Sequence, residues 1–195
     1  MRGWKLAGIA MAAALLLGGC FNGTGSYPVG LKLQNGVVGQ GLWHSSGGPD
    51  CSFSTTTFPL GGVVNPSVVE PARAGPRYVD FLAGDFRFDT AGCGPWVQAG
   101  GPLDALHPTN AYGVLEGDGD FRVGIEVPPG RYQATSPTTC SWQRVRDFGH
   151  RVPDPDPNGI FPSTIIASGT SDTVDIAPTD AGFTTSNCGA WRRIG

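Results

Sequence analysis

A cysteine-centred phrase that occurs twice constrains the fold of this chain more than any other feature. One copy runs from Phe183 to Trp191, and an earlier copy runs from Phe88 to Trp96. Both copies place Phe, Thr, Cys, Gly and Trp at the same spacing, and each has an Asp three residues before the Phe. Self-similarity at a long period is typical of repeated structural units, so we expect two related modules.

A second pair of phrases supports the repeat. Gly41-Leu-Trp43 followed by Cys51-Ser-Phe53 corresponds to Gly130-Arg-Tyr132 followed by Cys140-Ser-Trp142, with equal spacing throughout. We therefore predict module 1 over residues 29–97, a linker over 98–112, and module 2 over 113–195.

Residue patterns within the modules predict strands. Apolar residues alternate with polar ones in short segments such as Tyr78–Phe81, Phe121–Ile125 and Val174–Ile176. Gly 31 and Pro 17, beside 39% hydrophobic residues, indicate many tight turns between short elements. We expect an all-β chain: two tandem small β-sandwich or barrel-like modules after a signal peptide. The formal net charge of −3 and the lack of a basic cluster argue against nucleic acid as a partner.

The N-terminus has the pattern of an export signal. Arg2 and Lys5 precede an apolar segment over 6–17 that is too short to span a bilayer as a helix. Its end, Leu17-Gly-Gly-Cys20, resembles the bacterial lipobox. That resemblance implies removal of residues 1–19, acylation of Cys20 with diacylglycerol and palmitate-type chains, and a lipid bilayer as partner. The protein is then exported, lipid-anchored at the bacterial cell membrane and extracytoplasmic, with 20–28 as a flexible lipidated tether. The alternative is an ordinary signal peptide with an incidental Cys20.

The cysteine count agrees with this interpretation. If Cys20 carries lipid, four cysteines remain, and four allow three pairings. Equivalence of the repeats selects Cys51–Cys93 and Cys140–Cys188. Each bond would stabilise a small module by about 4 kcal/mol in the chain-entropy model. No Cys-x-x-Cys pair exists, which argues against a zinc site.

Module 2 resembles an uncharacterised disulfide-stapled extracytoplasmic β-module of high-GC bacteria. The resemblance rests on six phrases, which begin at Gly117-Asp-Gly-Asp120, Val127-Pro-Pro-Gly-Arg-Tyr132, Cys140-Ser-Trp142, Ile165-Ile-Ala, Thr179-Asp-Ala-Gly-Phe183 and Cys188-Gly-Ala-Trp191. Module 1 is a degenerate copy, because Val38-Gly-Gln-Gly-Leu-Trp43 replaces the proline-containing phrase. The resemblance implies an extracytoplasmic β-module and supplies no activity.

Two kinds of residue are candidates for a binding site. Trp43 and Tyr132 precede Gly/Ser/Thr/Pro-rich loops and could form a stacking platform for sugar rings, although large aromatics beside disulfides usually belong to the core. Asp154, Asp156 and Asn158 reproduce the first half of a calcium loop. Ile165 stands where that loop needs a bidentate Glu, so a polar surface turn is the alternative. No other cofactor is indicated.

Catalytic patterns are absent from the sequence. The three histidines are dispersed, and neither a G-x-S-x-G nor an H-E-x-x-H motif occurs. A spatial pair of carboxylates for glycoside hydrolysis stays open. We expect a membrane-anchored cell-envelope lipoprotein with a non-catalytic binding role toward a glycan or an envelope protein. The alternatives are a structural or accessory subunit of an envelope complex and, as a third reading, a hydrolase.

Overall fold

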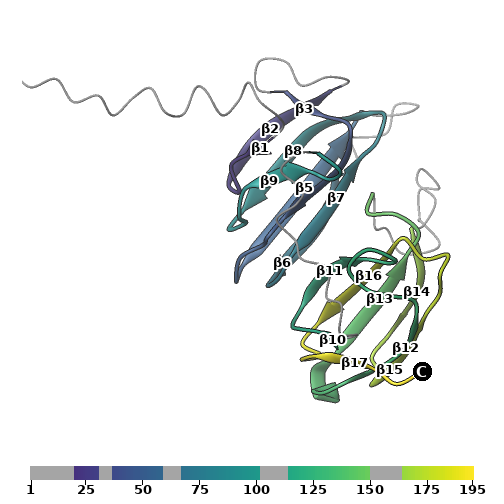
Figure 1. Ribbon diagram of the computed structural model, residues 1–195. Helices are drawn as coiled ribbons and strands as arrows, with labels where there is room; N and C mark the ends of the chain where they lie inside the picture. The colour runs from purple at the N-terminus through teal and green to yellow at the C-terminus, as the bar shows by residue number, and fades with distance from the viewer. Residues whose placement is uncertain (1–19, 31–36, 59–66, 102–113, 150–163) are drawn as a thin grey trace, which may run out of the picture.

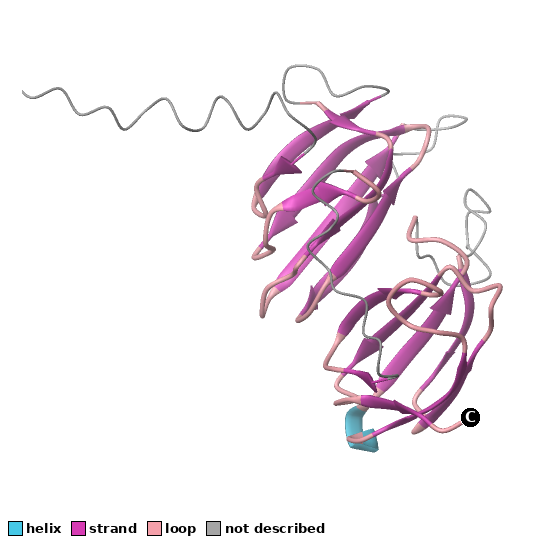
Figure 2. Cartoon of the chain, in the orientation of Figure 1, coloured by secondary structure: helices cyan, strands magenta, loops and turns pink. Residues whose placement is uncertain are grey.

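The computed structural model describes residues 20–30, 37–58, 67–101, 114–149 and 164–195. The predicted signal peptide, most of the linker and the calcium-loop residues Asp154, Asp156 and Asn158 lie outside these ranges. The all-β prediction is confirmed: apart from a short 3-10 turn at Pro137–Thr139, the regular elements of the described residues are strands (Figure 2). No helix in this part of the chain is long and apolar enough to cross a bilayer.

Strands β1 to β9 form two sheets, for which we keep the name module 1 (Figure 1). One sheet has the order β1-β9-β4-β7, and the other has the order β3-β2-β8-β5-β6. The strand bounds are β1 Cys20–Phe21, β2 Gly25–Gly30, β3 Val38–Gly39, β4 Gly41–Ser45, β5 Cys51–Thr57, β6 Ser67–Arg73, β7 Arg77–Phe81, β8 Asp85–Ala91 and β9 Trp96–Gln98.

Strands β10 to β17 form two further sheets, which make up module 2. Their orders are β10-β17-β12-β15 and β11-β16-β13-β14. The bounds are β10 Val114–Leu115, β11 Gly119–Arg122, β12 Gly130–Ala134, β13 Ser141–Val145, β14 Ile165–Gly169, β15 Thr173–Ile176, β16 Gly182–Ser186 and β17 Trp191–Arg193. Each sheet order in module 2 matches one in module 1 strand for strand, except that an isolated parallel bridge between Val123 and Val127 takes the place of β3.

Alternation of side chains along the strands builds the cores. In β5, burial alternates at every residue, so that Cys51, Phe53, Thr55 and Thr57 face inward. The structure contains both disulfides selected by the repeat, Cys51–Cys93 and Cys140–Cys188. Beside each disulfide, a Phe and a Trp pack edge to face, with ring centroids 5.2 Å apart in Phe88–Trp96 and 5.3 Å apart in Phe183–Trp191. Each module therefore has its own stapled aromatic core.

The segment 20–28 is not the flexible tether that we expected. Cys20 and Phe21 form β1, whose residues pair with Val97 and Trp96 of β9. The Phe21 ring lies 5.2 Å from the Trp43 ring and 6.2 Å from the Trp96 ring. The Gly- and Ser-rich composition predicted flexibility, but burial of one aromatic ring and pairing of the backbone fix the segment in the fold.

Candidate functional site

The two aromatics expected to form a platform are core residues. Trp43 and Tyr132 are both 0% exposed, so neither presents a ring face to a ligand. Trp43 Nε1 donates to the carbonyl of Gly39 at 2.9 Å, and the Tyr132 hydroxyl donates to the carbonyl of Pro128 at 2.7 Å. In both modules the polar tip thus bonds to the carbonyl four residues earlier. Burial of the ring and satisfaction of its donor explain why these residues serve packing.

A candidate site lies instead where the modules meet, around Asp120 of β11. Asp120 is fully buried and accepts hydrogen bonds from Arg73 Nη2 at 2.7 Å and from the Tyr78 amide at 3.0 Å. Arg77 Nε lies 3.5 Å from the second carboxylate oxygen. On the module 2 side, the Thr184 hydroxyl donates to Asp120 at 2.9 Å. A carboxylate of one module is thereby enclosed by two guanidinium groups of the other.

The charges around Asp120 compensate one another. Arg77 is 0% exposed, donates from Nη1 to the carbonyl of Cys51 at 2.9 Å, and lies 3.3 Å from the Glu70 carboxylate. Its guanidinium also lies over the Phe53 ring, 4.9 Å from the centroid. With Arg73 and Asp120, these residues form a group of two acids and two bases. Asp120 and Arg77 are fully buried, and the 13% exposed side chains of Arg73 and Glu70 supply the opposite charges that such burial requires.

Apolar contacts complete the junction. Tyr78 of module 1 packs with Val145 and Phe148 of module 2, and the Tyr78 and Phe148 rings lie 5.0 Å apart. Backbone bonds run beside them, from the Asp80 amide to the Phe148 carbonyl at 2.9 Å and from the Asp120 amide to the Pro76 carbonyl at 2.8 Å. The pKa of Asp80 is raised by burial, and further by the nearby carboxylates of Asp147 and Asp85.

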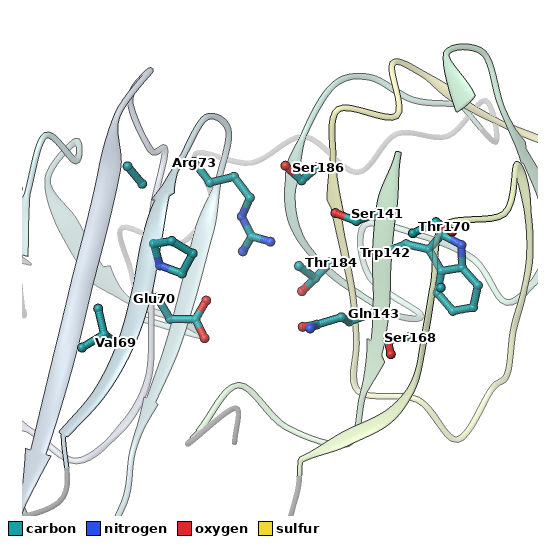
Figure 3. A pocket seen from close by; sticks show the side chains of 13 residues that line it. Val69, Glu70, Arg73, Ser141, Trp142, Gln143, Ser168, Thr170, Thr184 and Ser186 are labelled. Atoms are coloured by element: carbon teal, nitrogen blue, oxygen red, sulfur yellow. The ribbon is translucent and has the colours of Figure 1, made fainter. Parts of the chain in front are cut away.

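A cleft of ≈ 520 Å³ opens beside this junction. One wall is β6 of module 1, and the other is the outer face of the sheet β11-β16-β13-β14. Figure 3 shows Glu70 and Arg73 directed toward Thr184 and Gln143, with Trp142 beside Thr170. The described residues that line it are mostly polar: Val69, Glu70, Pro71, Ala72, Arg73, Ser141, Trp142, Gln143, Ser168, Gly169, Thr170, Thr184 and Ser186.

The cleft can supply hydrogen bonds of both kinds. Hydroxyls and an amide both donate and accept, a carboxylate accepts, and a guanidinium donates. Trp142 is partly buried, covers Gly169 and donates from Nε1 to the Ser171 carbonyl at 3.1 Å. None of the described lining residues is a His or Cys, and the described residues hold no group of three or more potential metal ligands.

Sequence similarity covers the module that contributes most of this cleft. Residues 113–192 match the family model of the Rv1352-like extracellular domain. No curated protein and no solved structure matches the chain. The match to the Rv1352-like domain and the two disulfides support an extracytoplasmic, disulfide-stabilised module and export out of the cytoplasm.

Sequence reasoning named few of the residues that form the site. Trp142 packs against the module 2 core and also lines the cleft, and Asp120 appeared only within the Gly117–Asp120 phrase. Cys20 lies in β1, half-buried and outside both disulfides. The partners of Asp120, Arg73 and Arg77, are in the other module, so no local pattern links them.

Proposed function

We propose that this chain is a lipoprotein of the bacterial cell envelope, acylated at Cys20, that binds a glycan non-catalytically in the cleft between its modules. The lipobox-like Leu17–Cys20 phrase supports the anchor. The Rv1352-like match supports the extracytoplasmic location. The cleft carries the binding proposal, because it is open to solvent and each wall presents polar groups among apolar ones.

The chemistry of the cleft favours a saccharide over a charged small molecule. Its single acid and single base among the described lining residues both take part in the charge group at Asp120. The remaining polar groups are hydroxyls and an amide, which match the alternating donors and acceptors of sugar hydroxyls. Sites that bind by such groups are concave and largely formed in advance, as this cleft is.

The role is proposed as non-catalytic because the described lining holds no His or Cys, and its one carboxylate, Glu70, is paired with Arg77. His44 is 1% exposed and stacks on Tyr78 at 5.4 Å, and it does not line the cleft. The other two histidines, His107 and His150, lie outside the described residues. A serine such as Ser141 therefore has no described His or Cys beside it to act with.

We also infer that the modules arose by duplication of one unit. Matching sheet orders support this, as do the donors of Trp96 and Trp191, which bond the hydroxyls of Thr90 at 3.2 Å and Thr185 at 2.8 Å. Asp85 and Asp180 accept from the amides three residues before them, at 2.8 Å in each module.

The anchor is tested by feeding cells an alkyne-tagged fatty acid and recovering the full-length protein. We expect the wild type to incorporate label and to sediment with membranes. Cys20→Ser should lose both properties while retaining its disulfides. Label on the Cys20→Ser variant, or none on the wild type, would overturn the anchor.

Binding is tested by co-sedimentation of the Cys20→Ser chain with purified cell-wall polysaccharide. Ser168→Trp, which fills the cleft from an exposed position, and Gln143→Ala should each reduce retention at least tenfold. Thr179→Trp, at an exposed turn outside the cleft, should retain wild-type binding. No retention of the wild type would favour the role of an accessory subunit. Trp43 and Tyr132 variants are unsuitable, because these side chains hold the cores together.

A further inference from the structure

The outer face of the β11-β16-β13-β14 sheet is partly covered by module 1, whereas the equivalent face of module 1 is open. Register identifies the equivalents. Ser141, Trp142 and Gln143 pair with Ser186, Thr185 and Thr184 in module 2. Ser52, Phe53 and Ser54 pair with Ala91, Thr90 and Asp89 in module 1. The outward residues Ser52, Ser54 and Asp89 thus correspond to Ser141, Gln143 and Thr184.

The carboxylate–hydroxyl pair that binds Arg73 in module 2 has a counterpart on the open face of module 1. There, the carboxylate and the hydroxyl stand on the opposite strands of the ladder. In module 2, Asp120 lies opposite Thr184 across the β11–β16 ladder, and Asp120 receives Arg73. In module 1, Ser26 lies opposite Asp89 at the equivalent place in the β2–β8 ladder. One carboxylate and one hydroxyl therefore occupy the same cross-strand site on both faces.

The open face is also hollowed. A recess of ≈ 370 Å³ is lined by the carboxylates of Asp89 and Glu70 and by the hydroxyls of Thr24, Ser52 and Ser54. None of the described residues lining the recess is basic. Asp89 accepts hydrogen bonds from Arg87 Nε and Nη2 at 3.0 and 2.9 Å, and the two side chains are 34% and 55% exposed. Asp120 holds two guanidinium groups at once, so Asp89 can accept a second guanidinium beside Arg87.

We propose that the open face of module 1, with Asp89 at its centre, binds a strand edge of another extracytoplasmic protein that carries an arginine. Asp89 accepts the guanidinium as Asp120 accepts Arg73, and the neighbouring serines bond to the edge of the strand. The docking of module 1 on module 2 is the template for this contact. Carboxylate pairing with the planar guanidinium gives the contact its direction and specificity.

The segment that docks on Asp120 is not available to the open face of a second copy of this chain. Arg73 and Arg77 are already buried against Asp120 in their own chain. The corresponding edge of module 2 carries Asp172 at the position of Arg77, since Val174 pairs with Tyr132 as Val79 pairs with Trp43. Asp172 would face Asp89, and like charges at close range disfavour contact. The proposal therefore commits to a different protein as the partner. Arg131, Arg192 and Arg193 of this chain are exposed, so self-association of the labelled chain that Asp89→Asn abolishes would contradict that choice.

The experiment uses the ¹⁵N-labelled Cys20→Ser chain and a synthetic peptide of residues 67–81 that is cyclised into a hairpin and carries both arginines. In the folded chain β6 and β7 belong to different sheets, so the peptide reproduces only the connecting turn and the two arginines that flank it. On titration, we expect shifts of the amide signals of Ser52, Ser54 and Asp89. Asp89→Asn should weaken binding at least tenfold. Asp175→Asn, which changes a carboxylate with a 78% exposed side chain in module 2, should not weaken it. A hairpin in which both arginines are replaced by alanine should fail to bind.

Three outcomes would overturn the proposal. Absence of shifts at millimolar hairpin is one, and equal binding by Asp89→Asn is another. Shifts confined to Ser141, Gln143 and Thr184 would mean that the hairpin displaces module 1 from module 2 instead. Each outcome leaves the glycan proposal intact, because co-sedimentation depends on the other face.

Discussion

Arg73 donates from Nη2 to Asp120 Oδ1 at 2.7 Å, and this contact joins two modules whose cores are separate. The pair is shielded from solvent, since the exposed fraction is 13% for the Arg73 side chain and 0% for that of Asp120. The position of β6 along the cleft therefore depends on a carboxylate from the opposite wall.

Replacement of Asp120 by alanine tests that dependence. Arg73 and Arg77 would lose their common acceptor in a buried place, which typically costs about 3–5 kcal/mol. We expect the free energy of unfolding in guanidinium chloride to fall by that amount and small-angle scattering to show a larger radius of gyration. Asp175→Ala, at an exposed pair, serves as control. An unchanged radius in the Asp120→Ala chain would show that the apolar contacts and the backbone hydrogen bonds hold the modules without the carboxylate.

Gly75→Ala should separate the modules sterically. Gly75 has φ +86°, and a Cβ there would overlap the Asp118 carbonyl of module 2. Gly117 is a matched control, because its φ is +81° but a Cβ would meet nothing within 4 Å. Both variants carry the strain of a left-handed residue, about 1–2 kcal/mol. Only Gly75→Ala should also increase the radius of gyration, and equal behaviour of the two would contradict a close backbone contact.

Tyr132→Phe isolates one hydrogen bond in the module 2 core. The hydroxyl donates to the Pro128 carbonyl at 2.7 Å, and the pKa of Tyr132 is raised by burial. Loss of the donor should lower the free energy of unfolding by about 1 kcal/mol. Tyr27→Phe, whose hydroxyl bonds to the Asn22 carbonyl near the surface, should cost less. A larger effect at Tyr27 would contradict the assignment.

Asp80→Asn should stabilise the chain at neutral pH. The raised pKa of Asp80 means that the folded state binds its proton more readily than the unfolded state. Ionised Asp80 therefore destabilises the fold above the raised pKa, and this cost disappears as pH falls below the ordinary value of 3.8. We expect a higher Tm for Asp80→Asn than for wild type at pH 7, with the difference vanishing in acid. A difference that persists in acid would point to packing.

Local patterns predicted the parts of the fold that depend on local chemistry. Alternation around Cys51 and Phe53 indicated a strand, and repeated spacing led to the cysteine pairs that the structure contains. The platform at Trp43 failed for a physical reason. A Trp before a polar loop has the same sequence context whether its ring points inward or outward, and the donor bond to Gly39 was not visible.

The cleft could not be predicted, because it depends on contacts between distant segments. Arg73 and Asp120 belong to different modules, and a Gly-Asp-Gly-Asp phrase is usually a solvated turn. Strand order alone places β6 at a sheet edge, and nothing in its sequence shows which surface that edge meets. The packing of the Phe21 ring was not predicted either, because the residues that follow it in the sequence are typical of a linker.

The pairing of Cys20 with Val97 sets the reach of the protein if Cys20 carries lipid. A flexible segment over 20–28 would allow a distance of up to roughly 30 Å between the modules and the bilayer. A segment that is paired as a strand adds no flexible length between the lipid and the fold. Module 1 would then lie directly against the lipid headgroups and rotate only together with its anchor. Encounters would then be confined to a thin layer at the membrane surface, and lateral diffusion in the bilayer would govern how partners are found.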